Sequence, residues 1–135
     1  MAERPHKKLK VWQKAIDFVE KIYRATEHFP AEERFGLVTQ MRRAAVSVAT
    51  NIAEGAARQT SRETTQFLFI SRGSISELDT HLEIASRLGF LDAERMASLA
   101  SDLSELSAMT NGLISNKRRA TFLTHSITSS LTHEP

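Results

Sequence analysis

Few side chains among the 135 residues have the type and spacing that metal chemistry requires. Glu77 and His81 stand four positions apart, so both lie on one face of a helix, where a carboxylate and an imidazole can bind a metal ion. Helical bundles with two metal ions, however, use several carboxylates and repeated Glu-x-x-His pairs. Here the pair has a different spacing and occurs once, so we expect no metal and no other cofactor.

The same segments contain two polar stripes with matching spacing. Unpaired polar groups in a core cost roughly 1–3 kcal/mol each, so buried stripes need partners. We expect a structural polar network that joins neighbouring helices, for example from the Asn51 amide to Glu77, and that fixes helix register and the geometry of an assembly. The predicted network comprises Ser47, Asn51, Glu54, Arg58, Ser74 and Glu77.

The chain offers little for catalysis. It contains no cysteine, its five histidines are scattered, and its serines lack a recognisable nucleophile turn. The stretch "NIAEG" is not a Gly-x-Gly-x-x-Gly phosphate loop. We therefore predict a protein that is not an enzyme. The lack of cysteine fits the cytoplasm, and no run of about 18 apolar residues predicts a membrane span.

Charge is unevenly distributed along the chain. Residues 1–62 contain twelve Lys and Arg against seven Asp and Glu, residues 63–116 contain three against eight, and the net charge of the whole chain is +2. This pattern predicts one basic and one acidic surface, which serve self-assembly or phosphate binding. The candidate nucleic-acid-binding residues are Lys7, Lys8, Lys10, Lys14, Lys21, Arg24, Lys117, Arg118 and Arg119. The alternative is a solvated basic face.

Apolar periodicity predicts the elements that position these residues. Four amphipathic helices are expected: one from about Leu9, one from Pro30 to about Ala57, one from the capping box "TSRE" to Gly89, and one from Asp92 to "NKRR" at 116–119. Short connections favour an antiparallel up-down-up-down four-helix bundle in an all-α fold. The predicted organisation is a basic arm over 1–8, the bundle over 9–115, and a Ser/Thr-rich tail over 116–135.

The second predicted helix has almost no polar face that could be exposed to solvent. The stretch "AAVSVATNIAEGAA" at 44–57 has one charged residue, and a helix that is apolar all round requires burial all round. Its own bundle covers only part of it, so we expect contact with another copy of the chain. The candidate interface residues are Ala49, Ala53 and Ala56, with Phe69 from an otherwise polar stripe of the third helix. Alternatively, Phe69 is a lone exposed aromatic.

The segments "FPAEERFGLVTQMRRAAVSVATNIAEGAAR" at 29–58 and "GSISELDTHLEIASRLGFL" at 73–91 resemble a known family. They are similar to the four-helix bundle proteins encoded in intervening sequences of bacterial 23S ribosomal RNA. The resemblance covers about residues 9–115 and implies a homopentameric ring. The family includes the accessory variability determinant of diversity-generating retroelements, which is thought to bind nucleic acid and a reverse transcriptase through basic surfaces.

Together, residues and resemblance predict a non-catalytic, cytoplasmic homo-oligomer, with the pentamer implied by the resemblance alone. The basic surfaces favour an accessory role with RNA, DNA or a nucleoprotein partner. This chain departs from the strongly basic retroelement protein, because its net charge is small. The alternative is therefore a purely structural or protein-interaction assembly without a nucleic-acid role.

Overall fold

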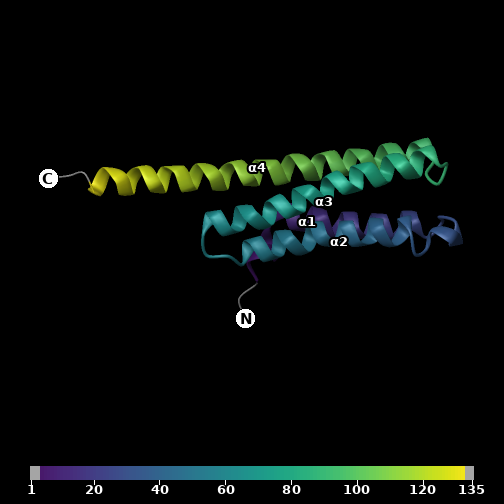
Figure 1. Ribbon diagram of the computed structural model, residues 1–135, viewed down its shortest axis with the longest axis horizontal. Helices are drawn as coiled ribbons and strands as arrows, with labels where there is room; N and C mark the ends of the chain where they lie inside the picture. The colour runs from purple at the N-terminus through teal and green to yellow at the C-terminus, as the bar shows by residue number, and fades with distance from the viewer. Residues whose placement is uncertain (1–3, 133–135) are drawn as a thin grey trace.

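The computed structural model describes residues 4–132, and the side chains of residues 4–120. Within this range the chain forms helices and no strands, which confirms the all-α, four-helix prediction (Figure 1). The elements are the 3-10 turn η1 (Pro5–Lys8), α1 (Lys10–Thr26), the 3-10 turn η2 (Ala31–Glu33), α2 (Leu37–Ala56), α3 (Ser61–Arg87) and α4 (Ala93–Thr132).

The four helices pack side by side around one core. Helix α1 contacts α2 and α4, and α3 contacts the same two helices. The α2–α3 connection lies at the end of the bundle near the N-terminus, whereas the α3–α4 connection lies at the opposite end (Figure 1). Segments that are far apart in the sequence, such as η1, the start of α3 and the middle of α4, are therefore gathered at one end of the bundle.

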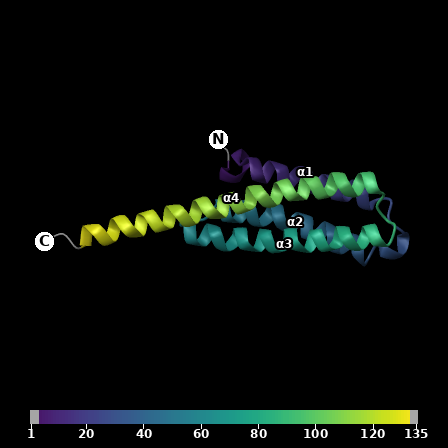
Figure 2. The ribbon, with the colours of Figure 1, turned by 90° about the horizontal axis from the view of Figure 1, so that it is seen from above.

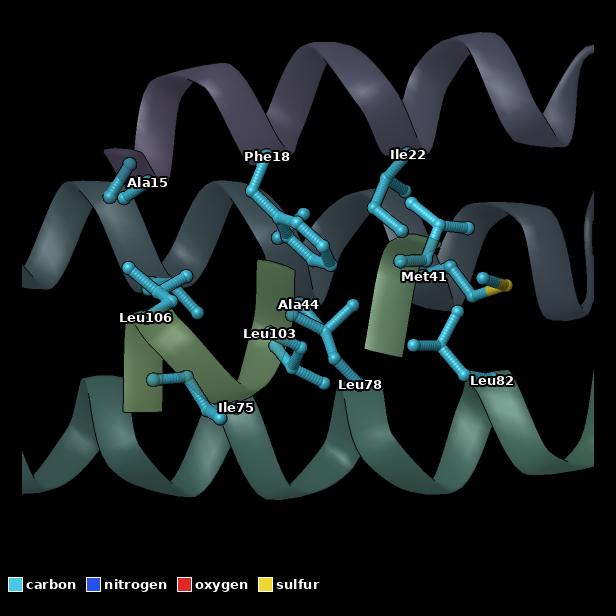
Figure 3. Packing of buried hydrophobic residues seen from close by; sticks show 14 of the residues in the cluster. Ala15, Phe18, Ile22, Met41, Ala44, Ile75, Leu78, Leu82, Leu103 and Leu106 are labelled. Carbon is cyan, nitrogen blue, oxygen red and sulfur yellow. The ribbon is translucent and has the colours of Figure 1, made fainter. Parts of the chain in front are cut away.

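All four helices contribute large side chains to the core, and several of these interdigitate between the helices (Figure 3). Burying each large apolar side chain contributes roughly 1.5–3 kcal/mol. The largest fully buried apolar side chains are Phe18, Ile22, Met41, Ile52, Leu68, Leu78, Leu82, Leu106 and Val48.

Side-chain caps fix where two of the helices begin. The Glu63 amide donates to Thr60 Oγ1 over 3.1 Å, as the expected capping box requires. The Glu63 side chain also reaches back to Thr60, because its carboxylate accepts from the Thr60 hydroxyl over 3.0 Å. Asp92 caps α4 as expected, because its Oδ1 accepts from the Arg95 amide over 2.7 Å.

Gly89 ends α3 in a left-handed conformation with φ of 76°. The Gly89 amide donates to Ser86 O over 3.1 Å and the Phe90 amide donates to Ala85 O over 2.9 Å, which is a Schellman motif. The motif places Phe90 against Phe29, with ring centroids 5.4 Å apart. The α1–α2 and α3–α4 connections are thereby joined at one end of the bundle.

The predicted start of the second helix at Pro30 is wrong. Residues Ala31–Glu33 form a separate 3-10 turn, and α2 begins at Leu37. Gly36, with φ −109° and ψ −109°, leaves the helical region and breaks the segment. The Glu33 carboxylate accepts from the Leu37 amide over 3.2 Å and so satisfies one donor of the first turn of α2, although the N-cap residue is Gly36.

The predicted end of the fourth helix at 116–119 is also wrong, since the backbone stays helical to Thr132. The 40 residues of α4 span about 60 Å, against about 40 Å for the 27 residues of α3. Figures 1 and 2 show α4 projecting past the other helices. The lysine and arginines of "NKRR" are good helix formers and no glycine follows them, so the local sequence does not end the helix at this point. Residues 1–3 of the predicted arm and 133–135 of the predicted tail lie outside the described residues.

Candidate nucleic-acid interface

Two of the predicted phosphate-binding lysines pair with acidic residues of the same chain. Lys14 Nζ lies 2.8 Å from Glu105 Oε2 and 3.5 Å from Asp102 Oδ1. Lys21 Nζ lies 2.7 Å from Asp102 Oδ2. The basic α1 and the acidic α4 therefore complement each other within one protomer, which accounts for part of the charge asymmetry in the sequence.

The titration of these groups reflects the pairing. The hydrogen bond to Glu105, helped by the charges of Glu105 and Asp102, raises the pKa of Lys14 although burial opposes it. Burial would raise the pKa of Asp102, but the hydrogen bond and charge of Lys21, together with Lys14, outweigh it and hold that pKa below its ordinary value. A phosphate ligand would have to displace these internal partners to reach Lys14 or Lys21.

The remaining predicted cations of the N-terminal half are placed differently. Arg24 pairs with Glu20 one turn away. Lys7, Lys8 and Lys10 are exposed at the N-terminal end of the bundle, where η1 packs on α2. These three lysines remain accessible candidates for phosphate contact.

The predicted cations of α4 meet α3 at the same end of the bundle. The Arg118 guanidinium carbon lies 4.7 Å from the centroid of the Phe69 ring, and the Arg72 guanidinium carbon lies at the same distance. A recess of about 320 Å³ beside them is lined by Arg62, Thr65, Gln66, Phe69 and Arg118. Arg119 is exposed and Lys117 is half-buried. Phe69 is half-buried and supports two arginines, an arrangement that neither sequence interpretation included.

The structure brings together part of the predicted polar network. Asn51 Nδ2 donates to Ser47 O over 2.9 Å and to Ser47 Oγ over 3.2 Å. The Ser74 hydroxyl donates to Ser47 Oγ over 2.9 Å, which links α3 to α2. Glu54 and Arg58 form a separate exposed pair at 2.7 Å. The Glu77 side chain is exposed, and the Asn51 amide bonds to Ser47 in its own helix where we expected Glu77 as the acceptor.

Sequence reasoning missed two buried hydroxyls at the α2–α3 contact. Ser71 Oγ donates to Val48 O over 2.9 Å, and Thr64 Oγ1 donates to Gly55 O over 2.8 Å. With Ser74 they follow the seven-and-three spacing of a buried helix stripe. That spacing was the sequence signal that could have identified these hydroxyls. The two bonds from hydroxyl to carbonyl groups join α3 to α2.

Ala49, predicted at a contact with a sister subunit, is 4% exposed within the single chain, so little of its surface is left for a second copy. Helix α3 covers this segment closely: a Cβ on Gly55 would lie 3.2 Å from Thr64 O. Ala53 and Ala56 are half-buried and remain accessible in part. The segment is therefore buried in part because its small residues allow α3 to pack closely against it.

The two residues considered for metal chemistry differ in burial, since Glu77 is exposed and His81 is buried. His81 is buried, and its Nδ1 is a buried side-chain atom without a hydrogen-bond partner within the described part of the chain. Burial lowers the pKa of His81, while the charge of Glu77 opposes the shift. Over residues 4–120 no cluster of three His, Asp or Glu side chains is arranged to hold a metal ion.

The fold and these surfaces define a four-helix bundle protein with a cationic end. Over the described residues, no helix is long and apolar enough to cross a membrane. The chain belongs to the 23S rRNA-intervening sequence protein family, whose model matches residues 7–112.

A solved structure supports the fold. It is a protein of unknown function from the S23 ribosomal protein family of Bacteroides thetaiotaomicron, 22% identical, with a TM-score of 0.70 over 77% of this chain and 97% of that one. The comparison with curated proteins gives no significant match.

Proposed function

We propose that this protein is a non-catalytic assembly protein whose copies associate through the open face of α2 and α3. The observation that carries the proposal is a groove of about 600 Å³ on that face. Ile70 in the groove is 51% exposed, and Val46 on the same helix pair is 41% exposed. Removing such apolar surface from water favours association by about 25 cal/mol per Å².

The groove also carries charge that selects its occupant. Arg43 and Glu77 line it together with small residues such as Ala44 and Gly73. A docking surface must match both signs of charge and must approach the backbone closely, which a helical surface of a second copy does. The resemblance to the family supports a homopentameric ring, in which each copy uses two different surfaces. The α2–α3 groove supplies one of these surfaces.

Native mass measurement tests the proposal. Ile70→Glu introduces a charge into the groove, so the variant is expected to be monomeric at concentrations where the unaltered protein is pentameric. Leu88→Glu is the matched control, because Leu88 is 58% exposed but follows α3 outside this groove. An unaltered protein that is monomeric rejects the assembly, and a fully assembled Ile70→Glu variant rejects the face.

A second candidate function is a cytoplasmic accessory role with RNA, DNA or a nucleoprotein. The favouring observation is the cationic end, where Lys7, Lys8 and Lys10 lie on the N-terminal segment and Arg62 and Arg118 converge on one recess. Several copies in a ring would multiply a weak contact. Binding to mixed cellular RNA and DNA that weakens steeply with salt supports this role. Absence of binding at low salt leaves the purely structural or protein-interaction assembly.

A further inference from the structure

A recess lies where α4 passes the first turns of α3, and its lining is entirely neutral or cationic. Arg62, Thr65, Gln66 and Phe69 come from α3, and Arg118 comes from α4. The recess, of about 320 Å³, is shallow and open to solvent, and the three arginines at or beside it, Arg62, Arg72 and Arg118, are exposed. Positive charge from two helices is thus concentrated on one small surface.

The Phe69 ring orders two of these arginines. The guanidinium carbons of Arg72 and Arg118 both lie 4.7 Å from its centroid, which is within the range of cation–π attraction. A guanidinium held against a ring keeps its N–H groups available in its own plane, and this planar fork matches the oxygens of a phosphate group. The aromatic ring therefore acts as a support that reduces the entropy lost when an anion binds.

Two acidic residues at the α2–α3 end of the bundle form side-chain bonds within the chain. The Glu63 carboxylate accepts from the Thr60 hydroxyl over 3.0 Å, and Glu54 pairs with Arg58 at 2.7 Å. Among the described residues, the lining of the recess contains no carboxylate, whereas Lys14 and Lys21 of α1 are paired with acidic residues of α4. The recess is consequently better placed to bind an external anion than the lysine stripe of α1.

We infer that this recess binds the phosphodiester backbone of a nucleic-acid strand without reading its bases. Arg62 and Arg72 are ten positions apart on α3, about 15 Å along the helix axis, a span longer than one phosphate group. A nucleic-acid strand carries a phosphate at every nucleotide, so a strand that crosses this surface presents several phosphates over that span. Contacts to phosphate carry no sequence information, so affinity is expected to depend little on sequence. The inference rests on the nucleic-acid role proposed above and assigns its site.

A double substitution, Arg62→Gln with Arg118→Gln, tests the site in the full-length protein. Fluorescence anisotropy with labelled single strands of mixed sequence gives the affinity at several salt concentrations. We expect at least a tenfold loss of affinity and a decrease of about 1.4 in the slope of log K against log salt, since each lost phosphate contact changes it by about 0.7. The matched control is Arg87→Gln with Arg95→Gln at the opposite end of the bundle, expected to change affinity less than twofold.

A lysine pair separates arginine geometry from charge alone. Arg62→Lys with Arg118→Lys is expected to keep the salt slope and to lose part of the affinity, because an ammonium group lacks the planar fork. Circular dichroism melting confirms that each variant is folded.

Three outcomes overturn the inference in distinguishable ways. If the unaltered protein binds strands and the glutamine pair binds them equally well, the site is wrong while the nucleic-acid role stands. If the unaltered protein binds no strand at low salt, both the role and the site fail. If millimolar inorganic phosphate binds and fully displaces the strand, the recess is a small-anion site.

Discussion

Replacing Gly55 with alanine tests the close contact between α2 and α3, which buries much of the apolar stretch at 44–57. Gly55 is buried near the end of α2, and an added Cβ would lie 3.2 Å from Thr64 O and 3.3 Å from Phe67 Cβ. The Thr64 hydroxyl also donates to Gly55 O over 2.8 Å. Because Thr64 O belongs to the backbone of α3, it cannot rotate away from the new methyl group.

Two opposing effects determine the magnitude. Alanine in place of glycine in a helix stabilises the folded state by about 0.5–1 kcal/mol. An extra methyl group in a well-packed contact costs about 1–3 kcal/mol, because α2 and α3 must separate and stretch their hydrogen bonds. We therefore expect Gly55→Ala to lower the free energy of unfolding by about 1 kcal/mol.

Gly112→Ala is the matched control, since no atom lies within 4 Å of a Cβ at that position of α4. It is expected to stabilise the protein by about 1 kcal/mol. For a domain of this size 1 kcal/mol corresponds to about 4 °C, so the two variants should differ in Tm by about 8 °C. Thermal unfolding followed by circular dichroism at one fixed protein concentration measures this difference. Equal stabilisation by both substitutions would refute the close approach of the two helices.

Three further predictions concern the ion pairs, the buried histidine and the cap of α3. Asp102→Asn should lower the free energy of unfolding by about 0.5–1 kcal/mol at pH 7. Lys21 and Lys14 depress the pKa of Asp102 in the folded state. The difference in unfolding free energy between the variant and the unaltered protein should therefore decrease as the pH falls below 3.8, the ordinary pKa of the group, and should vanish below the lowered pKa, as measured by urea unfolding. Burial depresses the pKa of His81, so the wild-type Tm should fall as pH drops below 6.5, and a smaller fall is expected for His81→Gln between pH 8 and pH 5. Thr60→Ala should cost about 1 kcal/mol through loss of the cap, whereas Thr50→Ala on the exposed side of α2 should be neutral or slightly stabilising; equal losses in the two variants would argue against the cap.

The four helices could be predicted from the sequence because each one buries a stripe of apolar residues that recur at helical spacing. Caps at Thr60, Asp92 and Gly89 were predictable for the same reason, since each uses residues within a few positions. The errors occurred where no local signal determines the outcome. Gly36 interrupts a segment with good helix-opening residues, and α4 continues beyond the length of its neighbours.

The candidate site was predictable only in part because its contacts join distant segments. Lys14 looks free in the sequence, and its partner Glu105 becomes apparent only when α1 is known to lie against α4. Arg118 was predicted as a cation, but its contact with Phe69 depends on where α4 passes α3. Ala49 was assigned to an interface because periodicity cannot distinguish burial within a chain from burial between chains.

The contact between Phe29 and Phe90 gives the two ends of the bundle different local stability. One end has both connections joined by aromatic rings and closed by the Schellman motif, so its amides should exchange with solvent slowly. The opposite end holds the exposed cations and the departing part of α4, and like charges there repel one another. Opening is therefore expected to begin at the cationic end, where a bound polyanion would slow it.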